Sequence, residues 1–179
     1  MEAIEALREQ LAYAHYLVEQ CLEDLTPDQL HQLPAGRART IAGVYAQGLA
    51  AEDRAVQSTL QQKEPLATTT WNGKQGLSAL PPPGGSDPTD WARSVRVDLP
   101  ALRGYAQDVY TASDEYLGSL SPEDLDRELD IGGGRMQSLN WVLFAFVIGR
   151  VTTACGEIAA VRRAQGLAGY PVTGEERGT

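Results

Sequence analysis

Two charged residues lie on what the sequence predicts to be the buried face of a helix. After Ser138, apolar side chains recur every three or four residues, starting with Leu139, Leu143 and Phe146, as in a helix with one face in the core. Arg150 and Glu157 continue the same face, seven residues apart. Because an unpaired buried charge is very costly, both side chains need partners. A guanidinium can clamp a carboxylate or phosphate group, so Arg150 is the first candidate for a binding residue.

The other residues that could take part in binding or catalysis give weaker evidence of a functional site. Gly132-Gly133-Gly134-Arg135 precedes a predicted helix but lacks the spacing of a phosphate-binding loop, so a turn is expected there. Cys21 and Cys155 have no metal-site or disulfide spacing and are expected as small buried apolar residues, a reactive thiol being the alternative. His15 lies one residue off an apolar seam, which favours a solvated or half-buried packing role. His31 is expected at the surface. No Ser/His/Asp or Cys/His set is evident.

Four long helices are predicted to position these residues. Apolar side chains spaced by three and four residues mark each one, and Thr40 and Ser138 are placed to cap the second and fourth. Gly166 stands where a helix-terminating glycine belongs. Pro100 should kink or split the third helix near Asp98. The predicted ranges are 4–25, 40–62, 87–120 and 138–166.

The predicted connections between the long helices contain a short internal sequence repeat. Leu25-Thr26-Pro27-Asp28-Gln29-Leu30 returns as Leu120-Ser121-Pro122-Glu123-Asp124-Leu125, each a capped short helix between two long ones. Residues 65–87, which include Pro81 to Gly85, are predicted as a long loop of functional or mobile character. We therefore predict an all-α, up-and-down four-helix bundle with short connector helices. It forms a single domain over residues 1–171, with a polar tail at 172–179.

Composition limits the partners. A chain of 179 residues, 42% of them hydrophobic, fits one globular domain. The net charge of −9 argues against nucleic acid and against an anionic membrane surface. The longest apolar run, from Trp141 to Ile148, is too short to span a bilayer, and Met1 to Glu5 lacks signal-peptide features. A cytoplasmic location is expected.

The closing segment carries a family resemblance. Gly156 to Pro171, GEIAAVRRAQGLAGYP, is similar to the closing segment of the DinB-like (DinB/YfiT-like) family of bacterial four-helix bundles. The run from Leu25 to Leu30, and Thr40-Ile41 leading into Glu52, resemble that family's first half. The resemblance covers roughly residues 4 to 171 and implies both the bundle fold and a homodimer.

The resemblance also implies a divalent metal held by three histidines at one end of the bundle. The matching positions here are Gln47, Arg150 and Ala154, none of them histidine. Alanine supplies no donor atom, arginine is a permanent cation that repels a metal ion, and glutamine is a weak neutral ligand. We therefore predict that the family-type metal site is lost, and we expect no metal or other cofactor.

Three arrangements of Arg150 remain open. In the first, it fills the former metal site through a buried ion pair with Glu52. In the second, it lines an open pocket and clamps a small anionic ligand. In the third, the helical stripe is shifted by one residue and Arg150 lies at the surface. The candidate pocket comprises Tyr45, Gln47, Glu52, Trp71, Arg150, Ala154 and Glu157. Glu157 matches an acidic position that is common in the family and can serve the fold alone.

The functional hypotheses follow from the predicted loss of the three histidine metal ligands. The first is a non-catalytic bundle that works by binding or by forming homodimers, with an anion-binding pocket at Arg150. The alternative is a metal-dependent thiol transferase, isomerase or hydrolase, as the resemblance implies for some relatives. A third hypothesis is a small-molecule sensor or carrier that uses the Arg150 pocket without chemistry. Fold resemblance alone does not license a reaction.

Overall fold

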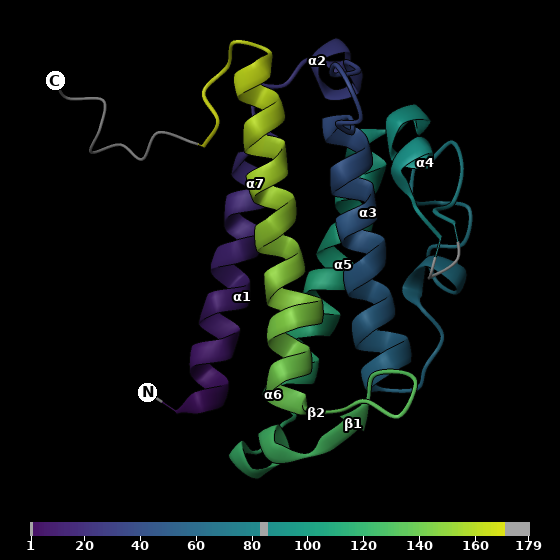
Figure 1. Cartoon of the computed structure of the whole chain (residues 1–179). Coiled ribbons are helices and arrows are strands. Elements are labelled where there is room, and N and C mark those ends of the chain that lie inside the picture. Colours follow the sequence, from purple (N-terminus) through teal and green to yellow (C-terminus); the bar gives the residue numbers. More distant parts are fainter. Residues whose placement is uncertain (1, 83–85, 171–179) are drawn as a thin grey trace, which may run out of the picture.

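The protein is mainly helical, which confirms the all-α prediction at the level of fold class. The computed structural model describes residues 2–82 and 86–170 (Figure 1). The predicted tail at 172–179 and Pro83 to Gly85 of the predicted loop lie outside the described residues.

Four long helices surround the core. They are α1 (Ala3–Gln20), α3 (Ile41–Asp53), α5 (Leu99–Gly118) and α7 (Gly149–Ala164). They run side by side along one direction (Figure 1), and their contacts close a ring, because α1 contacts α5 and α7, and α3 contacts the same two helices. The core lies inside this ring. Its most deeply buried side chains include Leu22, Ile41, Val44, Tyr45, Leu102, Tyr105, Leu139 and Ile158.

Two of the predicted helices contain π-helical segments. Helix α3 continues directly into η1 (Arg54–Leu60), and α6 (Leu139–Val142), η4 (Leu143–Ile148) and α7 follow one another without a break. A π-helical turn takes up extra residues, so the side chains beyond it rotate to a new face. The buried residues of α7 are accordingly Val151, Cys155, Ile158, Ala159 and Val161. The predicted stripe through Arg150, Thr153 and Glu157 is therefore wrong beyond η4.

Local capping signals place several helix starts as predicted, although α1 ends at Gln20, before the predicted end at residue 25. The hydroxyl of Thr40 accepts a hydrogen bond from the Gly43 N–H at 3.0 Å, and that of Ser138 accepts one from the Trp141 N–H at 3.2 Å. Thr26 caps α2 (Pro27–His31). Before the short 3-10 helix η3 (Pro122–Asp126), the N–H and the hydroxyl of Ser121 both donate to the Asp124 carboxyl group, so the repeated sequence forms a similar but not identical helix start. Gly166, at a φ of +79°, follows the end of α7.

The third predicted helix is split, as Pro100 indicated. Its first part is α4 (Thr89–Ser94), and α5 begins at Leu99, with the side chain of Asp98 accepting a hydrogen bond from the Ala101 N–H at 3.4 Å. Helix α4 packs against α3. Between η1 and α4 the chain forms the 3-10 helix η2 (Leu66–Thr68), and Leu77 of this stretch forms an antiparallel bridge with Val97, which lies between α4 and α5.

A small hairpin is the element that the sequence pattern missed. Strands β1 (Glu128–Asp130) and β2 (Met136–Ser138) pair antiparallel, with Leu129 opposite Gln137. The three glycines from Gly132 to Gly134 all have positive φ, which explains why this sequence suits the turn between the strands. The predicted turn at these glycines is confirmed, and it joins the two strands.

One helical stretch, Leu139–Ala164, is long and apolar enough to cross a membrane by length and composition alone. In this fold it packs against α1 and α3.

Candidate ligand-binding groove

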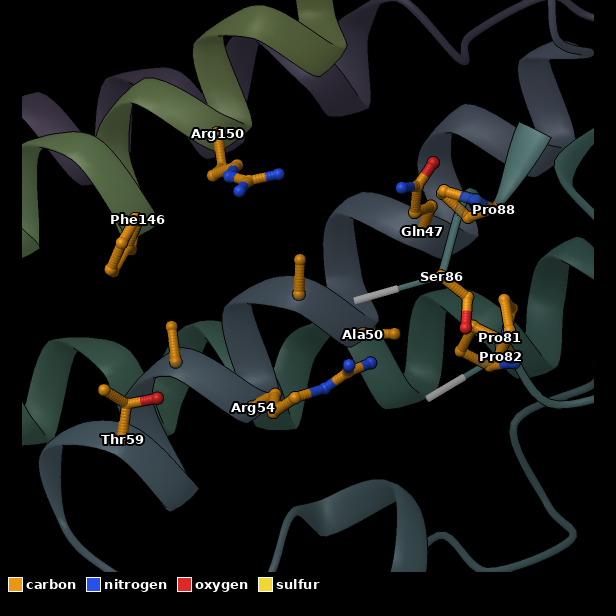
Figure 2. A pocket seen from close by; sticks show the side chains of 12 residues that line it. Gln47, Ala50, Arg54, Thr59, Pro81, Pro82, Ser86, Pro88, Phe146 and Arg150 are labelled. Carbon is orange, nitrogen blue, oxygen red and sulfur yellow. The ribbon is translucent and has the colours of Figure 1, made fainter. Parts of the chain in front are cut away.

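A groove opens between α3 with η1 on one side and η4 with α7 on the other. It encloses about 360 Å³. Figure 2 shows Pro81, Pro82 and Ser86 gathered at one end and Phe146 and Thr59 at the other. We call it the arginine groove, and its lining residues are Gln47, Ala50, Ala51, Arg54, Ala55, Thr59, Pro81, Pro82, Ser86, Pro88, Phe146 and Arg150.

Two guanidinium groups face this space from opposite sides. Arg150 reaches in from α7 and is exposed, and Arg54 reaches in from η1 and is half-buried (Figure 2). Among residues 2–82 and 86–170, neither side chain has a hydrogen-bond or ion-pair partner. No carboxyl group is found among the described lining residues, although the chain as a whole carries a net charge of −9. The groove is therefore a local positive site on an acidic protein.

The rest of the lining is apolar with a few hydroxyl and amide groups. Phe146, Pro81 and Pro82 offer carbon surface at the two ends, while Thr59 and Ser86 offer hydroxyl groups. Sites for small molecules commonly combine an apolar lining with a few placed polar groups. This lining suits an anion that carries an apolar body.

A second hollow adjoins the arginine groove. It measures about 470 Å³ and shares Gln47, Ala51 and Arg150 with the groove. Its other lining residues are Arg39, Val44, Gly48, Phe144, Ala145, Gly149, Thr153 and Ala154. Arg150 therefore lines both depressions.

The positions that match the family metal ligands gather in this adjoining hollow. Gln47, Arg150 and Ala154 all line it. The amide oxygen of Gln47 accepts a hydrogen bond from the Arg39 guanidinium, Arg150 brings a positive charge, and Ala154 brings a methyl group. Within the described ranges, no three His, Cys, Asp or Glu side chains cluster closely enough to hold a metal ion. This donor set does not fit a divalent metal.

The predicted ion pair between Arg150 and Glu52 is wrong. Glu52 is fully buried and its carboxyl group is bound by His15 and Ser113. The Ser113 hydroxyl donates to Oε1 at 2.6 Å, and His15 Nε2 lies 2.9 and 3.0 Å from the two oxygens. The π-helical segment before Arg150 turns its side chain away from this buried cluster, which accounts for the error.

His15 is more deeply placed than its position beside the seam suggested. It is buried, and its ring stacks on that of Tyr110 with centroids 3.7 Å apart. The solvated or half-buried role predicted for it is therefore corrected to a buried hydrogen-bonding role. His31 is likewise more than a surface residue, because its Nδ1 lies 2.9 Å from the Pro27 carbonyl oxygen and its Nε2 accepts from the Val97 N–H at 3.0 Å.

Glu157 has found a partner that the sequence did not indicate. The Arg39 guanidinium donates to both of its carboxyl oxygens, one at 2.8 Å, and also reaches Gln47. Arg39 lies in the connection before α3, 118 residues from Glu157, so no sequence spacing could have linked them. Glu157 serves this contact between α7 and the connection before α3, and it does not line the arginine groove.

Tyr45 and Trp71 lie away from the arginine groove. The Tyr45 hydroxyl donates to Glu19, and its ring lines a narrow internal space with Glu52 and Ala154. Trp71 Nε1 donates to Asp108 at 2.7 Å. Of the seven candidates, the structure therefore brings Gln47 and Arg150 into the groove and Ala154 into the adjoining hollow.

Arg54 is the groove residue that the sequence interpretation missed. It follows Gln47 by seven residues on the same predicted helix, which places both on one face. That spacing was the available signal. No sequence spacing indicated that Pro81 and Pro82 line the groove, because their position depends on how the long loop folds back.

Two buried tyrosines, Tyr45 and Tyr105, and the half-buried Tyr110 donate hydrogen bonds to acidic side chains. Tyr110 donates to Glu19 at 2.9 Å and Tyr105 to Asp53 at 2.8 Å, and Tyr45 also donates to Glu19. Burial is the largest cause that raises the pKa of all three phenols above the ordinary value, and the acidic neighbours add to it. These tyrosines act as neutral hydrogen-bond donors.

Comparison with known proteins shows a shared fold. No protein-family model and no curated protein matches the chain. The crystal structure of a conserved protein from Enterococcus faecalis superposes with a TM-score of 0.77 at 21% sequence identity, covering 91% of this chain and 96% of that one. At this identity the likeness concerns the fold alone.

Proposed function

We propose that this chain is a non-catalytic binding protein that holds a small anionic molecule in the arginine groove. The observation that carries the proposal is the pair Arg54 and Arg150, which face one space from opposite helices without partners among the described residues. A carboxylate or phosphate group placed between them receives charge-assisted hydrogen bonds from both sides.

The groove also limits the size and character of the ligand. A space of about 360 Å³ lies at the lower end of the range for small-molecule sites. The ring of Phe146 and the two prolines Pro81 and Pro82 favour an apolar or aromatic body attached to the anionic group. Thr59 and Ser86 are placed to bind a further polar atom.

Binding of phenyl phosphate to the purified protein tests the proposal. We expect this probe to raise the melting temperature and to give a measurable heat of binding, and benzyl alcohol, which lacks the charge, to do neither. Arg54→Gln or Arg150→Gln should each weaken binding by roughly 10- to 100-fold, the equivalent of one lost charge-assisted hydrogen bond. Arg96→Gln is the matched control, because Arg96 is exposed and does not line the groove.

Equal losses in all three variants would show a general charge effect and refute a specific site. Binding of phenyl phosphate that none of the variants changes would place the anion elsewhere. Weaker binding only in the two groove variants, at constant salt, would support the proposal, since screening acts on all three arginines alike.

We further propose that the fold is an up-and-down four-helix bundle of the DinB-like kind whose metal site has degenerated. The closed ring of α1, α5, α3 and α7 and the closing segment Gly156 to Pro171 support this assignment. Metal analysis of the purified protein tests it against the thiol-transferase alternative. Stoichiometric zinc or nickel, with a melting temperature raised by the same ion, would overturn the loss of the site.

A homodimer that works in the cytoplasm completes the proposal. Phe144 is 63% exposed and Trp141 38% exposed, both on the η4–α6 surface beside the groove. Exposed aromatic side chains are frequent at interfaces between subunits. Light scattering should give the mass of two chains, and Phe144→Ser should shift the equilibrium toward one chain. A monomer at high protein concentration would refute this part alone.

A further inference from the structure

The two cysteines of this chain meet inside the molecule. Cys21 follows the last residue of α1, and Cys155 lies in α7, 134 residues further along. Their sulfur atoms are 3.7 Å apart, and the residues are 0% and 2% exposed. A disulfide bond has a sulfur–sulfur distance of about 2.05 Å, so an approach of roughly 1.7 Å would bring the two atoms into bonding range.

The surroundings hold three segments of the chain around these sulfurs. Cys21 Sγ lies 3.7 Å from the Gly169 carbonyl oxygen. The Arg162 guanidinium donates to the Cys21 carbonyl oxygen at 2.9 Å and to that of Ala168 at 2.8 Å. The end of α1, helix α7 and the segment after it are therefore tied together at this point. The cysteine pair lies where these three segments join.

The two thiols are chemically unequal. A hydrogen bond from the Cys155 thiol lowers the pKa of Cys21, burial opposes this shift, and the positive charges of Arg162 and Arg163 support it. The same hydrogen bond, together with burial, raises the pKa of Cys155. Because the thiolate is the nucleophile, Cys21 is the sulfur that reacts first and Cys155 the one that resolves the product.

We propose that Cys21 and Cys155 form a reversible intramolecular disulfide when the protein meets hydrogen peroxide. The Cys21 thiolate attacks one peroxide oxygen, the O–O bond breaks, and Cys21 becomes a sulfenic acid while the departing hydroxide takes up a proton. The Cys155 thiol then attacks the Cys21 sulfur, and the hydroxyl group leaves with the thiol proton as water. Two electrons pass from the sulfurs to the peroxide, and two thiols and one peroxide become one disulfide and two waters.

The burial of the Cys21 thiol determines how peroxide reaches it. Peroxide is small and uncharged, and it reaches Cys21 when the segment that includes Gly169 opens locally. Once formed, the bond closes a loop of more than a hundred residues between the first and last helices, which restricts the unfolded chain strongly. The oxidised protein should therefore melt at a higher temperature than the reduced one, by roughly 5–15 °C.

The experiment uses the reduced protein, whose 179-residue sequence contains only these two cysteines. After exposure to hydrogen peroxide, remaining thiols are alkylated in denaturant, and the products are separated by mass. We expect both thiols to disappear together, the mass to fall by two hydrogens, and a peptide linking Cys21 to Cys155 to appear. Dithiothreitol should reverse all three changes.

Two variants test the order of attack, and the wild-type result stands without them. In Cys155→Ser, we expect a sulfenic acid at Cys21 that dimedone traps. In Cys21→Ser, Cys155 should react more slowly than Cys21 does in Cys155→Ser, because burial raises the pKa of the Cys155 thiol, whereas Arg162 and Arg163 lower the pKa of Cys21. Persistence of both wild-type thiols under peroxide that oxidises a free thiol would overturn the proposal. Separate over-oxidation of the two cysteines, or disulfides only between molecules, would overturn it equally.

Discussion

Replacement of Gly43 by alanine should damage both the stability of the protein and its groove. Gly43 lies in the first turn of α3, directly against α4. A Cβ atom at this position would lie 1.8 Å from the Ala92 carbonyl oxygen and 2.5 Å from the Ala92 carbonyl carbon. These are backbone atoms, which cannot move aside by a rotamer change. Helix α4 must therefore shift away from α3 to admit a single methyl group.

The size of the effect follows from what that shift breaks. The Thr40 hydroxyl donates to the same Ala92 carbonyl oxygen at 2.9 Å, and Ala92 is fully buried. Overpacking costs about 1–3 kcal/mol, and a buried carbonyl group that loses its donor costs a further 1–3 kcal/mol. We expect Gly43→Ala to lower the free energy of unfolding by about 4 kcal/mol, a large part of the stability of an ordinary domain.

The control lies five residues further along the same helix. A Cβ atom at Gly48 would find Ala154 Cβ at 3.5 Å, an ordinary contact, so Gly48→Ala should gain up to about 1 kcal/mol from its helix propensity. Urea unfolding followed by circular dichroism measures both variants. Because Ser86 and Pro88 precede α4 and line the arginine groove, Gly43→Ala should also weaken phenyl phosphate binding. Equal stability of the two variants would refute this packing argument.

Two further predictions concern the buried polar groups. Burial raises the pKa of Tyr45, Tyr105 and Tyr110, while the unfolded chain releases these protons near pH 10. The stability they contribute is therefore present below pH 10 and lost as the pH rises, at about 1.4 kcal/mol per pH unit for each tyrosine, or about 4 kcal/mol for all three. Urea titrations at pH 9, 10 and 11 check this slope, and a flat profile would contradict it. His15→Leu should cost about 3 kcal/mol, because it removes a partner from the buried carboxyl group of Glu52. The double variant with Glu52→Leu should recover much of that loss, and simple additivity in the same unfolding assay would argue against the pairing.

The sequence by itself determined where several helices begin, whereas α1 ends at Gln20, before its predicted end at residue 25. A capping side chain bonds a backbone N–H only two or three residues away, so Thr26, Thr40 and Ser138 carry this information locally. The split before α5 follows from Pro100 for an equally local reason. The tight turn at Gly132 to Gly134 was also visible, but the hairpin around it was not, since strands of three residues carry too little pattern to be recognised.

The tertiary structure decided which charged and reactive side chains meet. The π-helical segment η4 changed the register of α7, and with it the face on which Arg150 and Glu157 lie. The pairs that matter join residues far apart in the chain, such as His15 with Glu52 and Cys21 with Cys155. Sequence spacing constrains only neighbours on one helix, while these contacts depend on how separate helices pack. The groove, the buried acid cluster and the facing thiols therefore appeared only in the folded protein.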